Sequence, residues 1–161
     1  AKQLPRDNNR FFEERENIIF RNFQKFYQNS PKSKWYGQWG SRHIHQHPIS
    51  ELQSIAYKLS QDPQSPIPSQ VLSILYIYQN SAHLNNNPYR VKQLNSSPFK
   101  KEFELLSLGI YTLFSLMEDQ SPFQKDLIWL THSNTPTDGV TTDYFQYLLL
   151  VDGAEAARPL E

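Results

Sequence analysis

Three histidines alternate along one short segment of the chain, in a pattern that bears on metal chemistry. His43, His45 and His47 are separated by single residues, so in an extended backbone all three side chains point the same way. Neutral imidazoles are common ligands of zinc, copper and nickel, so one hypothesis is a His-metal-dependent enzyme. No carboxylate lies nearby in the sequence, and solvated or capping histidines are the alternative. In a third interpretation they become cationic in mild acid and add to a basic surface.

The histidines lie within a stretch that is rich in basic and aromatic residues. Residues 17–50 contain no acidic side chain. Basic groups bind anionic partners, and aromatic rings stack on bases or act as apolar anchors. The sequence therefore predicts a binding surface around residues 20–47, although its tryptophans would also suit the edge of a core. The candidate residues are Arg21, Lys25, Lys32, Lys34, Trp35, Tyr36, Trp39 and Arg42.

The net charge is zero, but the charges are unevenly distributed along the chain. Residues 17–101 carry ten basic and two acidic side chains, a net charge of +8. Residues 102–161 carry two basic and ten acidic side chains, a net charge of −8. Such asymmetry indicates an interaction surface. Two alternatives are that the halves neutralise each other within one fold, or that they meet head to tail in self-association.

Signatures of catalysis are mostly absent from the sequence. The five glycines form neither a phosphate-binding loop nor a dinucleotide fingerprint. There is no nucleophile elbow and no HExxH motif. The lack of cysteine excludes thiolate nucleophiles, disulfides and Cys-based zinc sites. We therefore expect a protein without enzymatic activity and without a cofactor.

The elements that would position these residues carry helical signals. Segment 68–83 is apolar nearly all round, which is typical of a helix at the centre of a core. Three prolines in residues 62–68 end the helix before it. We expect an all-α fold, a compact single domain of about six helices with helix 68–83 central. The expected helices span residues 7–28, 50–61, 68–83, 97–117, 121–130 and 142–151.

We expect residues 1–152 to form this helical domain and residues 153–161 to be a disordered or cloning-derived tail, because their composition differs from all that precedes them. No segment is apolar over a length that spans a bilayer, and no signal peptide is visible. The bias toward Asn, Gln and Ser resembles proteins of AT-rich bacterial genomes, including effectors of intracellular pathogens. These features favour a soluble protein in the cytoplasm or inside a host cell.

Together these patterns favour a non-catalytic interaction module, either a whole protein or part of a larger one. The expected partner is an acidic protein surface, with a nucleic acid or an anionic lipid headgroup as alternatives. The metal-dependent enzyme and the self-association module remain the rival hypotheses.

Overall fold

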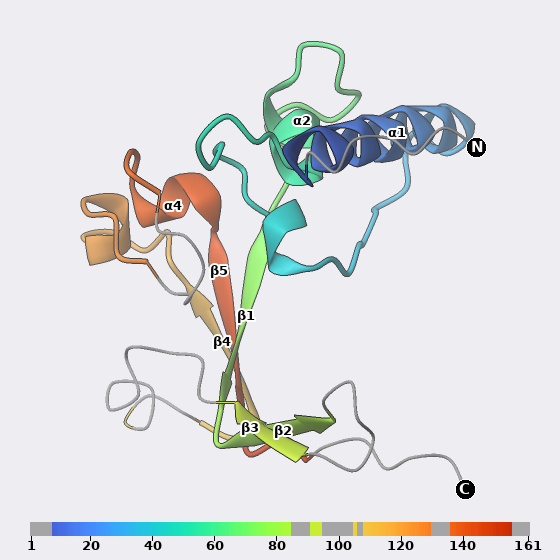
Figure 1. The fold of residues 1–161 in the computed structure, drawn as a ribbon. Coiled ribbons are helices and arrows are strands. Elements are labelled where there is room, and N and C mark those ends of the chain that lie inside the picture. Colours follow the sequence, from blue (N-terminus) through green and yellow to red (C-terminus); the bar gives the residue numbers. More distant parts are fainter. Residues whose placement is uncertain (1–7, 85–90, 95–104, 106–107, 130–135, 156–161) are drawn as a thin grey trace, which may run out of the picture. The chain divides into compact units, whose positions relative to one another are not determined.

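The computed structural model describes residues 8–84, 91–94, 105, 108–129 and 136–155 (Figure 1). The chain forms two compact units. The N-terminal unit consists of Ala1–Ser73 together with Asp143–Phe145, and the sheet unit consists of Ile74–Thr142 and Gln146–Glu161. Three residues from near the end of the chain therefore belong to the N-terminal unit.

Helix α1 (Asn8–Asn29) is the longest element of the N-terminal unit, and it confirms the helix expected over residues 7–28. Phe12, Glu16 and Phe20 are buried at intervals of four residues, so all three lie on one face of the helix. Helix α2 packs against α1. A polar residue in this row shows that the buried face is not purely apolar.

Helix α2 (Ile55–Gln61) begins five residues later than the expected helix over residues 50–61. Ser54 is its N-cap, and the Ser54 hydroxyl accepts a hydrogen bond from Tyr57 N at 3.0 Å. Ser50, the first residue of the expected helix, has φ of 57°, a left-handed conformation outside the range of a helix start.

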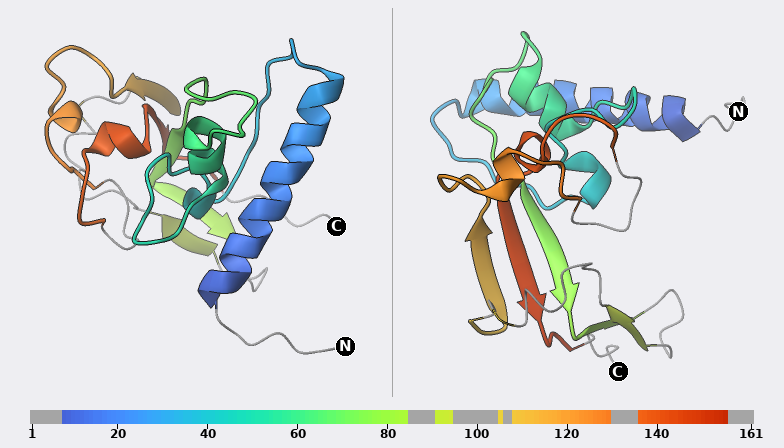
Figure 2. Two further views of the ribbon diagram at one scale, coloured as in Figure 1. Left: turned by 90° about the horizontal axis from the view of Figure 1, so that it is seen from above. Right: turned by 90° about the vertical axis from the view of Figure 1, so that its left-hand side faces the viewer.

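Three strands form a mixed sheet in the order β1–β5–β4. Strand β1 (Ile74–Gln79) runs parallel to β5 (Tyr147–Asp152), with Ile77 opposite Leu150. Strand β4 (Tyr111–Ser115) pairs with the other edge of β5 in antiparallel orientation. Figure 2 (right) shows the red strand β5 between its two neighbours. Strand β5 is therefore the strand that holds the sheet together.

A second, two-stranded sheet lies in the same unit. Strand β2 (Ser81–Leu84) pairs with β3 (Val91–Leu94) in antiparallel orientation. It follows β1 after one residue, Asn80, whose φ is 46°. Asn is among the residues that tolerate this left-handed conformation, which turns the chain sharply between the two strands.

The prediction of an all-α domain with a central helix over residues 68–83 is wrong, because β1 and β2 occupy that segment. Side chains along β1 alternate: Leu75 and Ile77 are buried, whereas Tyr76 is 37% exposed. A run that is apolar on every side fits a buried strand as well as a buried helix, so its periodicity does not decide between them. The β-branched and aromatic residues of the run favour the strand.

The expected helices in the second half of the chain are also wrong over most of their described residues, since only residues 105 and 142–144 of them are α-helical. Strand β4 occupies the end of segment 97–117, of which residues 97–104 and 106–107 lie outside the described ranges. Segment 121–130 holds only the short 3₁₀-helix η2 (Pro122–Gln124). The segment expected as helix 142–151 begins in the four-residue helix α4 (Thr141–Tyr144) and continues as β5.

The described part of the chain contains no helix that is both long enough and apolar enough to cross a membrane. Of the expected tail, residues 153–155 are described, and residues 156–161 lie outside the described ranges.

We predict that Leu150→Ala destabilises the sheet unit. Leu150 is fully buried on the central strand, opposite Ile77 on β1 and Thr112 on β4. Truncation of such a side chain lowers the free energy of unfolding by about 2–5 kcal/mol.

The measurement is urea unfolding followed by the fluorescence of Trp129, which is 9% exposed and lies in the sheet unit. Replacing Trp35 and Trp39 by Phe leaves Trp129 as the sole tryptophan, since the chain has three. The matched control is Leu113→Ala on β4, where a leucine that is 57% exposed should cost no more than about 0.5 kcal/mol. An equal loss for both variants would contradict the described burial.

Candidate interaction surface

Residues 30–40 form an exposed loop between α1 and the 3₁₀-helix η1 (Ser41–His43). The loop leaves α1 through a turn in which Ser33 N donates to Ser30 O at 3.1 Å. It then runs back along α1 (Figure 2, left). Five residues of the predicted surface lie on it: Lys32, Lys34, Trp35, Tyr36 and Trp39.

The aromatic side chains of this loop are partly packed and partly open. Tyr36 is 76% exposed, and Trp35 and Trp39 are each 45% exposed. The Trp35 ring meets the ring of Phe23 edge-on, with their centroids 5.6 Å apart. Each indole therefore combines the two roles considered from the sequence, because one part packs on the protein and the rest faces solvent.

Gly37 makes room for the indole of Trp39. A Cβ atom at residue 37 would lie 2.0 Å from Trp39 Nε1, far inside the contact distance of two such atoms. The Trp39 ring in turn lies 5.9 Å from the ring of His43, measured between centroids. The missing side chain of Gly37 thus allows the loop to fold over its own tryptophan.

A buried carboxylate connects α1 to the two elements that follow the loop. Glu16 is fully buried, and its Oε2 accepts a hydrogen bond from Ile55 N at 2.7 Å. Its Oε1 lies 2.8 Å from His43 Nδ1, a close polar contact without the alignment of a hydrogen bond. Arg15 Nη2 lies 3.1 Å from Nε2 of the same imidazole.

Aromatic and cationic groups cover this cluster. The Phe12 ring stacks on His43 at a centroid distance of 5.5 Å, and the Arg15 guanidinium carbon lies 5.2 Å from the centre of the Phe12 ring. Sequence reasoning did not single out Glu16. Its position four residues from both Phe12 and Phe20 is the signal that would have placed it on the buried face.

His45 lies inside the N-terminal unit. It is 4% exposed, and its ring meets that of Phe145 at a centroid distance of 5.2 Å. The Ser54 hydroxyl donates to the backbone carbonyl of His45. Burial lowers the pKa of His45 from 6.5 to about 4, with smaller contributions from the nearby charges of Arg42 and His43.

The three alternating histidines have both separate and shared neighbours. His43 contacts the Glu16 carboxylate. His45 and His47 both lie beside Tyr144, at ring-centroid distances of 6.2 and 5.1 Å, and His45 also packs on Phe145. Across the described ranges, no group of three His, Asp, Glu or Cys side chains is arranged to hold a metal ion. The structure therefore offers no support for the metal site considered from the sequence.

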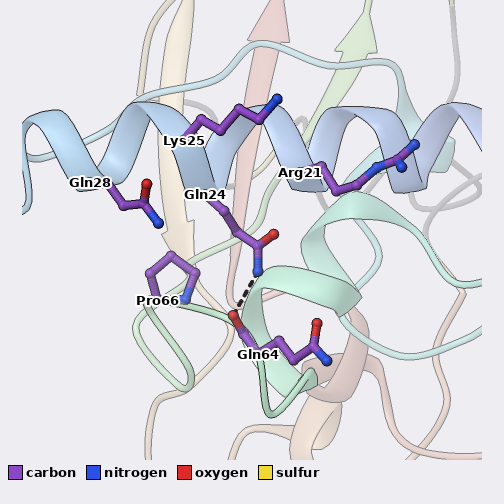
Figure 3. Close-up of a pocket in the computed structure, with 6 residues that line it drawn as sticks. All are labelled: Arg21, Gln24, Lys25, Gln28, Gln64 and Pro66. Atoms are coloured by element: carbon purple, nitrogen blue, oxygen red, sulfur yellow. Dashed lines mark hydrogen bonds between the residues drawn. The ribbon is translucent and has the colours of Figure 1, made fainter.

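A groove of about 320 Å³ lies between α1 and the segment that follows α2 (Figure 3). Gln24 Nε2 donates to Gln64 O at 2.8 Å and so joins the two walls. Two cations, three amides and a proline line the groove: Arg21, Lys25, Gln24, Gln28, Gln64 and Pro66. Of these, only Arg21 and Lys25 were among the sequence candidates, because no local pattern indicates that residue 64 lies beside residue 24.

The predicted surface is divided between two flanks of α1. Phe23 and Gln24 are neighbours in sequence and point about 100° apart around the helix axis. Phe23 faces Trp35, whereas Gln24 faces Gln64. We call Arg21 and Lys25 the groove part of the surface. The loop part consists of Lys32, Lys34, Trp35, Tyr36 and Trp39 with Arg42, which is exposed on η1.

Comparisons with protein-family models, with curated proteins and with solved structures find no match to this chain.

We predict that Glu16→Ala destabilises the N-terminal unit. The substitution leaves His43 and the Ile55 N–H without the carboxylate that both contact. Removing one member of a buried polar cluster lowers the free energy of unfolding by about 3 kcal/mol. Urea unfolding followed by far-UV circular dichroism, to which α1 contributes strongly, measures the effect. Glu13→Ala, at an exposed position of the same helix, is the control, and a similar loss there would contradict the special role of Glu16.

We predict that His45 makes the protein less stable as the pH falls. Its folded-state pKa of about 4 lies below the ordinary value of 6.5, so between these pH values the unfolded chain binds a proton that the folded chain does not. This contribution is absent above pH 6.5 and grows as the pH falls toward 4. Its limiting size is on the order of 3 kcal/mol.

Chemical denaturation of the wild type and of His45→Gln tests this effect. From pH 7.5 to pH 5, the variant should lose about 2 kcal/mol less stability than the wild type. Between pH 7.5 and pH 8.5, where His45 is neutral in both states, the two proteins should change in parallel. A variant that keeps the full acid sensitivity of the wild type would show that other groups cause it.

Proposed function

We propose that this protein is a non-catalytic binding module that engages an acidic protein partner through its basic-aromatic surface. The surface comprises the loop part and the groove part defined above. One observation carries the proposal: the loop part presents three partly exposed aromatic rings beside Lys32 and Lys34. An acidic partner would contact the aromatic rings as apolar anchors and the two lysines as opposite charges.

The chemistry of the loop suits a protein interface. Tryptophan and tyrosine supply large contact areas while losing only two side-chain torsions on binding, so they recur as energetic centres of interfaces. Trp35 is braced by Phe23, and Trp39 by Gly37 and His43, so part of each ring's orientation is fixed before a partner arrives. Such preorganisation lowers the entropic cost of association.

The charge of the surface also supports the proposal. The described ion pairs of the N-terminal unit join Arg10 to Glu14 and bring Arg15 and His43 to Glu16. In the described ranges, none of these pairs includes a cation of the basic-aromatic surface. Cations without an internal carboxylate are available to steer and retain an acidic partner.

We predict that poly-L-glutamate changes the tryptophan emission in a saturable way, with affinity that is lower at about 200 mM than at 50 mM salt because ions screen the exposed charges. Trp35→Ala and the double variant Lys32→Gln/Lys34→Gln should each weaken binding about 5- to 10-fold. Lys125→Gln removes a charge from an exposed lysine of the sheet unit and should leave the affinity unchanged.

Single-stranded RNA and phosphatidylserine vesicles are titrated in the same way. If either gave the saturable change and poly-L-glutamate did not, the acidic-protein assignment would fail. Light scattering at low salt tests for self-association. A concentration-dependent dimer would assign the surface to a second copy of the chain. If the wild type and both surface variants bound with equal affinity, the loop part would not belong to the interface.

A further inference from the structure

We infer that the groove along α1 is a peptide subsite that binds an acidic side chain of the partner together with the adjoining main chain. This inference rests on the proposed function and deepens it, because it assigns the groove part a ligand chemistry of its own. The groove lies within the N-terminal unit and is drawn in Figure 3.

The far wall of the groove is held in place before any ligand binds. Ser65 is buried, and its hydroxyl donates to Leu59 O at 2.5 Å and accepts from Ile67 N at 3.2 Å. Asp62 Oδ1 accepts from Gln64 N at 2.8 Å, which directs this carboxylate to the backbone of the wall. The Gln24–Gln64 bond joins this wall to α1.

The opposite wall supplies the charge. Arg21 and Lys25 are exposed and lie one helical turn apart, so their charged ends can reach a single carboxylate. Arg21 Nε donates to Asn17 O at 3.3 Å, one turn toward the N-terminus of α1. No described ion pair involves either side chain. A carboxylate placed between them would therefore gain two charge-assisted contacts without displacing a carboxylate of the described ion pairs.

The amides of the groove indicate a peptide main chain. A glutamine side chain carries both a donor and an acceptor, which matches the N–H and C=O groups of an extended peptide. Gln28 and Gln64 are exposed at two ends of the lining, and Pro66 adds an apolar contact between them. None of the lining residues is aromatic, so the groove lacks the flat ring on which a nucleic-acid base would stack.

The size of the groove limits what it can hold. Its volume of about 320 Å³ lies at the small end of ligand pockets, which suits one acidic residue and its neighbours rather than a large ligand. The loop part lies on the other flank of α1, beside Phe23. A peptide seated in the groove is therefore bound by residues that the tryptophans do not touch, and the two parts are separable by mutation.

The test is fluorescence anisotropy of a short labelled peptide of alternating Glu and Ser, titrated with the full chain at low salt. Arg21→Gln/Lys25→Gln should weaken binding at least about 10-fold, and Gln64→Glu, which places a negative charge in the wall, should do the same. Arg10→Gln/Lys125→Gln removes the same charge from two exposed cations that belong to neither part of the surface and is the matched control, with an expected change below about 3-fold. Circular dichroism checks that each variant folds.

Each other outcome overturns a defined claim. If the control variant loses as much affinity as the groove variant, the groove is not a specific subsite, although the proposed function survives. If a Gln–Ser peptide binds as well as the Glu–Ser peptide, the groove does not read acidic side chains. If the wild type binds neither the peptide nor poly-L-glutamate, both the subsite and the acidic-protein function fail. If single-stranded RNA displaces the peptide and binds more tightly, the ligand class is wrong.

Discussion

The buried carboxylate of Glu16 is the constraint on which the N-terminal unit depends. It accepts a hydrogen bond from the first residue of α2 and lies against His43 at the end of η1, so one side chain of α1 connects to both later elements. A carboxylate without partners would be costly at this depth, so the unit is stable only when all three elements are assembled together. The same contacts fix where the exposed loop before η1 rejoins the fold.

The sequence predicted the features that are local. The eight-residue spacing of Phe12 and Phe20 is about two helical turns and fits α1, and the acid-free run around the loop part is visible without a structure. The strands were missed because β1 is apolar on nearly every residue, and its pairing with β5 joins segments about seventy residues apart. The groove was missed for a related reason, since it exists only where Gln64 approaches Gln24. Neither the β1–β5 pairing nor the Gln24–Gln64 contact is indicated by any short segment of the sequence.

Helix α1 presents three different chemistries around its axis. The row containing Glu16 is buried, Arg21 and Lys25 lie on the groove flank, and Phe23 supports the aromatic loop. A strip containing Phe11, Ile18 and Phe26 is also exposed, at 64%, 50% and 61%. One rigid element therefore sets the spacing between the groove part and the loop part, and recognition of both by one partner would demand a fixed separation of its acidic and apolar contacts.

Tyr144 and Phe145 are fully buried, and they belong to the N-terminal unit although they are translated long after the rest of it. Gln46 N donates to Tyr144 O at 3.2 Å, so the late residues complete a contact that the early ones cannot make alone. A ribosome adding about 5–20 residues per second needs roughly 4–14 s to travel from residue 73 to residue 145. During that interval the nascent chain carries an incomplete core around His45. A chaperone could bind this region, or a protease could cleave it, during that interval. A chain released before residue 145 would keep the incomplete core permanently.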